Sequence, residues 1–406
     1  MSVSLDRRTF LSGSSVALSS MLFANSANAK PKRKEKIRHF IYVNLRGGPS
    51  QMDTFDAKPD HSNGGGVKGI KTAMKNVYFA ESYEGLADFS EHMALVHTSS
   101  RIGAHELGRY YVGTGGFLPN PAQVQPGLCS IAGWALAEEK ESDLPKVVSL
   151  GGSLSAGFLG NEFSPYSMKP GQNKLKVDED WRTRLIRSES LRDEYMKHSA
   201  NAHLDQIKEE LRHGRKATQL SLGISNRVFE LSGESPQTIE AYGKGIGQSF
   251  LQARRLIQAG VPSIEIPYGG WDTHQNNVER CRNLSEPLNK GLCQLLKELK
   301  VMGLLKNTMV MIAGDFGRTP KINANAGRDH YPMNTPILLI GGNLSGQHIG
   351  QSSKDGLSLE NAVTMGAFSY SLYRHLGFNP NEPYMHKSGR PLDLCPSKSG
   401  IDELMS

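Results

Sequence analysis

Short apolar runs, most of them ending at glycines, recur along this chain of 406 residues and constrain its fold more than any other feature. These runs lie at residues 39–45, 93–97, 147–150, 263–267, 307–313 and 335–340. Their near-continuous apolar character is typical of strands buried on both faces. Stretches with helical character, such as residues 236–257 and 278–305, separate them. This alternation predicts an α/β fold with a doubly wound, mostly parallel central sheet.

The amino terminus has the pattern of an export signal. Residues 6–11 read Asp-Arg-Arg-Thr-Phe-Leu, a weakly apolar stretch runs to Phe23, and residues 27–29 read Ala-Asn-Ala, the form of a cleavage site. Paired arginines followed by Phe-Leu resemble the twin-arginine signal. We therefore expect residues 1–29 to address the protein to the twin-arginine translocation machinery, and thus to the periplasm or the exterior. Residues 30–406 are expected to form a single domain, in which no stretch is long and apolar enough to cross a bilayer.

Charge and cysteine content exclude some classes of function. Lys and Arg number 47 against 40 Asp and Glu, a net charge of +7, and no basic stripe interleaved with aromatic residues accompanies this excess, so we expect no nucleic-acid partner. The segment 178–231 is highly charged with helical periodicity, and it is predicted to be a helical insertion. The four cysteines form neither a CxxC pair nor a zinc spacing, and we expect at most one disulfide.

The residues that follow the apolar run 263–267 are the strongest candidates for chemistry. Two glycines, Trp271, Asp272, a threonine and His274 come directly after Tyr268. In an open α/β sheet, ligand-binding groups lie on loops beyond the carboxyl ends of strands. A carboxylate and an imidazole are the materials of a divalent-metal site or an acid–base pair. From this stretch alone the alternative is equally strong: Asp272 could cap the following helix and His274 could simply pack.

Other apolar runs are followed by comparable residues. Asp53 comes soon after the run 39–45, where it is either a site residue or a turn and cap residue. Further polar candidates follow the later runs: His105, Asp315, Arg318, Arg328 and His330. His105 stands at the predicted start of a helix, a position where histidine commonly packs or caps. Because several strand ends carry such residues, we expect them to meet in a single crevice.

Taken together, these segments closely resemble the DUF1501 family, which is related to the sulfatase and alkaline phosphatase superfamily. The matching segments are residues 47–56, 253–256, 270–274, 314–320 and 327–330. The resemblance covers essentially the whole mature chain and implies an alkaline phosphatase-like fold. Enzymes of that superfamily bind one or two divalent metals at the carboxyl edge of the sheet, through Asp and His ligands.

The resemblance also implies roles for individual residues. Asp272 and His274 look like the ligand pair of one metal, and His330 looks like the histidine that completes it. Asp315 occupies the position of an Asp-His dipeptide that serves a second metal. His105 lies nine residues before Thr114, where the superfamily has its nucleophile.

The sequence departs from the superfamily pattern in two places that bear on metal number. Phe316 replaces the histidine of the Asp-His dipeptide, so one metal (Zn, or Ca or Mg) is expected rather than two. The first strand ends at Leu45-Arg46 where an aspartate is usual, and Asp53 could compensate as a ligand. A histidine at position 105 cannot become the formylglycine of a sulfatase, which argues against ordinary sulfatase chemistry.

Two functional hypotheses follow. In the first, the protein is an exported, metal-dependent hydrolase of phosphate or sulfate esters, acting on a small anionic ester or a sulfated or phosphorylated polymer. His105 would be its nucleophile or general acid–base, and Arg318 and Arg328, together with charge from Arg46, would hold the anion. In the second, the protein is a non-catalytic anion- or polymer-binding or assembly protein that retains the hydrolase fold.

Overall fold

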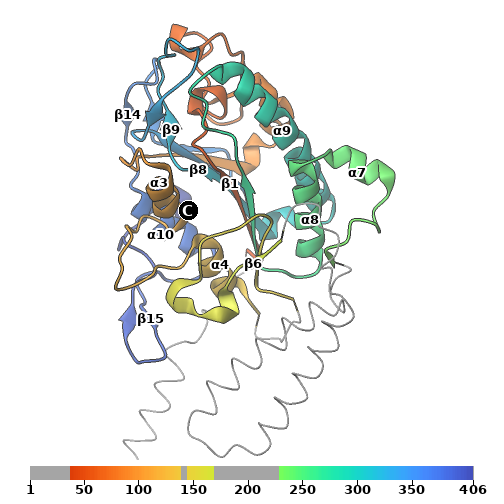
Figure 1. Cartoon of the computed structure of the whole chain (residues 1–406), viewed down its shortest axis with the longest axis vertical. Coiled ribbons are helices and arrows are strands. Elements are labelled where there is room, and N and C mark those ends of the chain that lie inside the picture. The colour runs from red at the N-terminus through yellow and green to blue at the C-terminus, as the bar shows by residue number, and fades with distance from the viewer. Residues whose placement is uncertain (1–36, 139–143, 169–227, 406) are drawn as a thin grey trace, which may run out of the picture.

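The computed structural model describes residues 37–138, 144–168 and 228–405, and these residues form an eight-stranded sheet with helices on both faces (Figure 1). In spatial order the strands are β12 (Gln347–Ile349), β4 (Met93–Thr98), β11 (Thr335–Gly341), β8 (Thr308–Gly314), β1 (His39–Leu45), β7 (Ser263–Tyr268), β5 (Val147–Ser149) and β6 (Tyr166–Ser167). The predicted α/β class with a doubly wound, mostly parallel sheet is confirmed. The export signal at 1–29 and the predicted insertion at 178–231, except for residues 228–231, lie outside the described residues.

One strand departs from the parallel arrangement. β11 runs antiparallel to both of its neighbours, β4 and β8, whereas all other neighbouring strands of the sheet are parallel. Gly341, at the end of β11, therefore pairs with Met309 near the start of β8. The glycines after this apolar run lie at the opposite edge of the sheet from those after the parallel strands. An apolar run followed by glycines marks a strand end, but it does not tell the direction of the strand.

The central strand β1 shows why these apolar runs become buried strands. Successive side chains of a strand point to opposite faces of the sheet. Ile41 and Val43 accordingly join the core on one face, while Phe40 and Tyr42 join the core on the other. Every residue of β1 is buried, which is the pattern expected when helices cover both faces.

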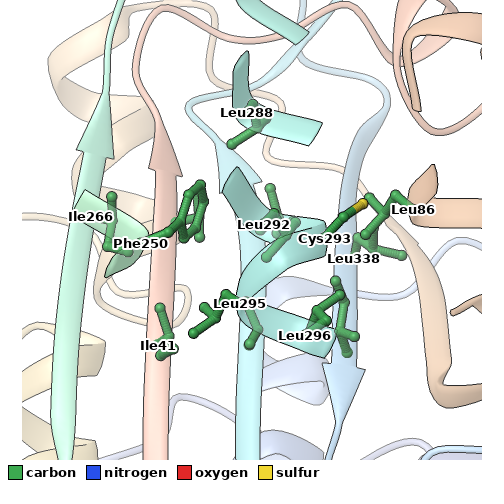
Figure 2. Close-up of a cluster of buried hydrophobic side chains, with 14 of the residues drawn as sticks. Ile41, Leu86, Phe250, Ile266, Leu288, Leu292, Cys293, Leu295, Leu296 and Leu338 are labelled. Atoms are coloured by element: carbon green, nitrogen blue, oxygen red, sulfur yellow. The ribbon is translucent and has the colours of Figure 1, made fainter. Parts of the chain in front are cut away.

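Helices α7 (Pro236–Tyr242), α8 (Ile246–Gln258) and α9 (Asn277–Val301) cover one face, and α3 (His105–Gly113), α4 (Leu128–Leu136) and α10 (Met365–His375) cover the other (Figure 1). The leucines of α9 at 288, 292, 295, 296 and 299 recur at helical spacing and are all buried. Figure 2 shows Leu288, Leu292, Leu295 and Leu296 packed over β7, β1, β8 and β11, with the arrow of β11 pointing opposite to the other three.

Helix α9 continues through Pro287, so the cysteines at 281 and 293 lie on one helix, and all four cysteines of the chain are buried and free. No helix in the described part of the chain combines the length and apolar character needed to span a bilayer.

The remaining elements are short. Four two-stranded ribbons pair β2 (Gly69–Lys71) with β3 (Tyr78–Ala80), β9 (Gly317–Arg318) with β10 (His330–Tyr331), β13 (Gln351–Ser352) with β14 (Leu359–Glu360), and β15 (Tyr384–Met385) with β16 (Pro391–Leu392). The other helices are α2 (Glu84–Ala87), α11 (Asp402–Met405) and the 3-10 turns η1 (Gln51–Asp53), η2 (Ser62–Gly64), η3 (Glu81–Tyr83), η4 (Ser90–His92), η5 (Gly157–Leu159), η6 (Asn161–Phe163) and η8 (Leu305–Asn307). The ribbon of β9 and β10 begins immediately beyond the carboxyl end of β8, and it carries candidate residues on both strands.

Candidate metal centre

The loop after β7 places Asp272 at the carboxyl edge of the sheet. Trp271, fully buried in the core, anchors this loop, and its backbone N–H donates to the carbonyl of Arg46 at the end of β1 (3.3 Å). Gly47 packs so closely here that a Cβ atom built on it would lie 2.6 Å from the backbone nitrogen of Asp272. Its φ of +108° is a second reason why glycine is needed at this position. The ends of β1 and β7 are thus in direct contact.

The carboxyl end of β8 supplies Asp315, which orients His105. The buried carboxylate of Asp315 accepts hydrogen bonds from the backbone N–H of Gly47 (3.0 Å) and from Nδ1 of His105 (2.9 Å). His105 is the first residue of α3. The helix approaches closely at Gly108, where a built Cβ would lie 2.8 Å from the carbonyl oxygen of Asp315. Asp315 and Gly108 together fix the imidazole of His105 over the end of β8.

The ribbon of β9 and β10 delivers two further residues to the same place. Arg318 and His330 are directly opposite each other in its register. His330 donates from Nδ1 to the carbonyl of Gly103 (2.7 Å), and this bond sets the direction of its ring.

These elements bring three imidazole side chains together around one oxygen atom, Oδ1 of Asp272. The Nε2 atom of His274 lies 3.0 Å from it, and the Nε2 atoms of His105 and His330 each lie 3.4 Å from it. The Nε2 atoms of His274 and His330 are 3.1 Å apart. In the group formed by His105, Asp272 and His330, all ligand atoms lie within 4.8 Å of one another. The predicted convergence of Asp272, His274 and His330 is therefore present in the structure.

Hydrogen bonds at the far side of each ring determine what these Nε2 atoms can do. Asp315, Asp329 and the Gly103 carbonyl accept from the Nδ1 atoms of the three histidines, with His274 to Asp329 at 2.7 Å. Carboxylate and carbonyl oxygens only accept, so each Nδ1 carries a proton, and the neutral form of each ring would present a lone pair at Nε2. The same pairing of imidazole with carboxylate or carbonyl orients histidine ligands in metal sites.

The spacing of the donor atoms fits a metal ion. Ligand atoms about 2.0–2.1 Å from a tetrahedral metal lie about 3.3 Å from one another. Within the predicted ligand set, the Nε2 atoms of His274 and His330 lie 3.0 Å and 3.4 Å from Asp272 Oδ1 and 3.1 Å from each other, which is close to that value. The Nε2 atom of His105 is buried and has no hydrogen-bond partner among the described residues. Lone pairs facing a carboxylate oxygen repel one another unless protons or a cation lie between them, so this donor set suits a bound cation.

Electrostatics favour the same conclusion. Burial acts to raise the pKa of Asp272, but the hydrogen bond and charge of Arg318, with smaller contributions from His105 and His274, lower it to about 2. Burial lowers the pKa of His330, which favours its neutral, metal-binding form. The lowered pKa values of Asp272 and Asp329 leave both of these carboxylates negatively charged near neutral pH. A divalent cation would neutralise this charge.

The two arginines predicted to hold an anion have other partners. Arg318 is fully buried and donates to the carbonyls of Gly47, Gly48 and Arg328, and to Asp272 Oδ1 at 2.5 Å. Arg328 is also fully buried, and its donors are taken by Asp53 and by the carbonyls of residues 63, 319 and 320. The prediction that these guanidinium groups bind substrate is wrong for this geometry. Arg318 holds the loops of the metal centre in place. The backbone carbonyl of Arg328 accepts a hydrogen bond from Arg318 and so helps to fix its guanidinium.

Asp53 does not join the cluster as the predicted metal ligand either. Its Oδ2 accepts from Arg328 Nε (2.8 Å), from Asn277 Nδ2 at the start of α9 (2.8 Å) and from the Ser50 hydroxyl. The carboxylate is buried and forms a structural ion pair. Asp53 therefore connects the loop after β1 to the start of α9 and to the loop between β9 and β10.

Asp329 lies within the matching segment 327–330, but the sequence does not predict a role for it. Burial contributes little at this exposed residue, and the hydrogen bond from His274 is the main cause that lowers its pKa. Its position directly before His330 was the available signal. The Gly103 carbonyl gave no signal, because any residue supplies a carbonyl oxygen.

The fold and the site together define a class of protein: an α/β protein with a doubly wound sheet whose carboxyl edge carries an imidazole–carboxylate cluster suited to a divalent metal. Residues 37–405 match the family model described as "Protein of unknown function (DUF1501)", and the chain belongs to this family. The predicted resemblance to it is confirmed.

Solved structures similar to this chain include sulfatases and members of the alkaline phosphatase superfamily. The PsFucS1 sulfatase from Pseudoalteromonas sp. is 12% identical, with 97% of this chain and 75% of that chain covered and a TM-score of 0.40. A protein in the alkaline phosphatase superfamily from Vibrio parahaemolyticus is 10% identical, with 86% and 68% covered and a TM-score of 0.38. Similarities this distant concern the fold alone. The comparison with curated proteins gave no match.

Proposed function

We propose that this protein is an exported, metal-dependent hydrolase of phosphate or sulfate esters that uses a single divalent metal held by Asp272, His274 and His330. The observation that carries the proposal is the set of imidazoles whose Nδ1 atoms are held by acceptors and whose Nε2 atoms all face Asp272 Oδ1. Three protein ligands leave a position open for water or substrate, as in catalytic rather than structural metal sites. The half-exposed side chains of Asp272 and His274 leave the cluster accessible from solvent.

The donor set bears on the identity of the metal. Two imidazoles and one carboxylate suit zinc better than calcium or magnesium, which prefer oxygen ligands. When bound, such a metal polarises an ester oxygen or lowers the pKa of a bound water to about 7. Phe316 supports the proposal of one metal rather than two, because its ring lies 4.9 Å from the ring of His105 and 4.5 Å from that of His330. It fills space beside the cluster with an apolar group that cannot coordinate.

His105 is the proposed nucleophile or general acid–base. Asp315 holds the proton on Nδ1, so the Nε2 lone pair is available to attack phosphorus or sulfur, or to remove a proton from an attacking water. The buried carboxylate also stabilises the positive charge that the ring gains when Nε2 forms a bond or takes a proton. This arrangement of a carboxylate behind an imidazole is the same one that activates histidine in acyl-transfer enzymes.

Metal analysis combined with an ester-hydrolysis assay tests the proposal. The full chain, purified without chelator, should hold about one equivalent of zinc or another divalent metal and should hydrolyse an aryl phosphate or an aryl sulfate. Less than about a tenth of an equivalent of metal together with no turnover would contradict the proposal. His105→Ala is the matched variant, since it should keep the metal and lose turnover. Metal loss in this variant would instead make His105 a ligand.

One observation favours the alternative, a non-catalytic protein that binds an anionic ligand or polymer. Arg318 donates to Asp272 Oδ1 and so occupies one lone pair of the oxygen that would bind the metal. A wild-type protein that holds no metal but retains a sulfated polymer on a column would support this alternative over hydrolysis.

A further inference from the structure

Arg46 differs in its surroundings from Arg318 and Arg328, the two fully buried arginines near the metal centre. It lies directly after β1 and is only partly buried. Its Nη2 donates to the carbonyl of Gly152 (2.6 Å), but its Nε is enclosed and has no hydrogen-bond partner among the described residues. A buried N–H without an acceptor is costly. The guanidinium of Arg46 therefore has capacity for a further acceptor, whereas the donors of Arg318 face acceptors of the protein: three backbone carbonyls, Asp272 Oδ1 and His274 Nε2.

The backbone of Arg46 adjoins the metal centre. Its carbonyl accepts from Trp271, the residue before Asp272 (3.3 Å). The next residue, Gly47, donates to the carboxylate of Asp315 that orients His105 (3.0 Å). Arg46 is thus one residue away from the support of His105 and is bonded to the loop that carries Asp272. The Arg46 side chain therefore originates at the same edge of the sheet as the cluster.

A buried carboxylate holds the surroundings of Arg46 in place. Glu265, in β7, accepts from Asn44 Nδ2 at Oε1 (3.0 Å) and from the Ser153 hydroxyl at Oε2. Asn44 lies two residues before Arg46, and Ser153 follows Gly152, the partner of the Arg46 guanidinium. Glu265 therefore links the end of β1, which carries Arg46, to the loop of Gly152 and Ser153, which the Arg46 guanidinium contacts. A buried acidic side chain in a central strand is expensive unless it is hydrogen-bonded, and here both of its oxygens are.

We propose that Arg46 binds the phosphate or sulfate group of the ligand beside the metal centre, and that Glu265 is the positioning residue that holds Arg46 there. The inference rests on the proposed function for the nature of the ligand. A planar guanidinium pairs with two oxygens of a tetrahedral oxyanion, which a single ammonium group does less well. Arg46 takes over the anion-binding role that Arg318 and Arg328, both fully buried, cannot fill.

Binding of inorganic phosphate and of sulfate to the metal-loaded full chain, measured by calorimetry, tests this inference independently of turnover. Arg46→Ala should weaken phosphate binding about tenfold or more at unchanged metal content, and Arg46→Lys should restore part of the affinity. The matched control is Arg282→Ala, which removes an exposed arginine of α9 that is bonded to Glu81 (3.1 Å), and it should leave the affinity unchanged.

Glu265→Gln tests the positioning role. It should weaken phosphate binding by less than Arg46→Ala does, and the double variant should bind phosphate no worse than Arg46→Ala alone. Additive losses would overturn the positioning role, because they would show that Glu265 acts independently of Arg46.

Phosphate affinity that is unchanged in Arg46→Ala would overturn the inference, and so would a metal-loaded wild type that binds neither oxyanion. Failure of the proposed function would look different: the wild type would lack metal, or would bind phosphate through Arg46 without hydrolysing any ester. In the second of these cases the anion-binding role of Arg46 stands.

Discussion

Replacing Asp53 by alanine should destabilise the protein strongly without removing its metal. The carboxylate of Asp53 and the guanidinium of Arg328 are both buried and lie 2.8 Å apart. Removing one partner of such a pair leaves an uncompensated buried charge, which costs about 3–5 kcal/mol. The side chains of Asn277 and Ser50 lose their acceptor in the same variant. We therefore expect a loss of about 4 kcal/mol in the free energy of unfolding, or a fall in melting temperature of roughly 2 °C per kcal/mol.

Urea denaturation of Asp53→Ala, followed with and without chelator, measures this loss. Asp60→Ala is the matched control, because Asp60 is exposed and its removal should change the stability by less than about 0.5 kcal/mol. In the background of Arg328→Met, which removes the buried charge, Asp53→Ala should cost less by about 2 kcal/mol or more. Equal costs in both backgrounds would refute the ion-pair argument. A drop in metal content at unchanged stability would restore Asp53 as a ligand.

Three further predictions concern the site. His274→Ala should lose the metal while the melting temperature of the chelator-treated protein stays close to that of wild type, and retention of metal on elemental analysis would contradict the ligand assignment. Arg318→Met should lower stability by about 3 kcal/mol or more, because three backbone carbonyls and Asp272 lose a buried donor; a thermal shift of under one degree would show that these bonds matter little. Burial raises the pKa of Glu265 above its ordinary value of 4.5, and hydrogen bonds from Ser153 and Asn44 oppose this increase. The protonated Glu265 side chain therefore stabilises the folded state below pH 4.5, and this stabilisation is lost as the pH rises through the raised pKa. Glu265→Gln should flatten the pH dependence of unfolding in that window, and identical profiles for wild type and variant would count against it.

The central strands were predictable because burial on both faces leaves a direct trace in composition. The run from His39 to Leu45 is apolar at nearly every position, and the structure buries all of it. Strand direction leaves no such trace. The run that became β11 looks like the others, yet it is antiparallel, because the ribbon of β9 and β10 keeps the chain at the carboxyl edge until the strand begins.

The candidate site was predictable to the extent that its chemistry was local. Asp272 and His274 are two residues apart, and they meet as expected. Asp53 looked equivalent in the sequence, since it also follows a glycine-rich strand end. What distinguishes it is Arg328, 275 residues further on, which the fold brings within 2.8 Å. Pairing over such a separation depends on the complete topology and cannot be read from the residues beside either partner.

The antiparallel course of β11 has a consequence for how this site can change. Because the chain leaves β8 and re-enters the sheet from the same edge, residues 315–334 form one uninterrupted excursion over the metal centre. That excursion holds the carboxylate behind His105, the buried guanidinium of Arg318, and the neighbouring residues Asp329 and His330. Half of the metal centre therefore lies within twenty consecutive residues. A single recombination event between the genes of related proteins could replace this segment without changing the strands of the sheet.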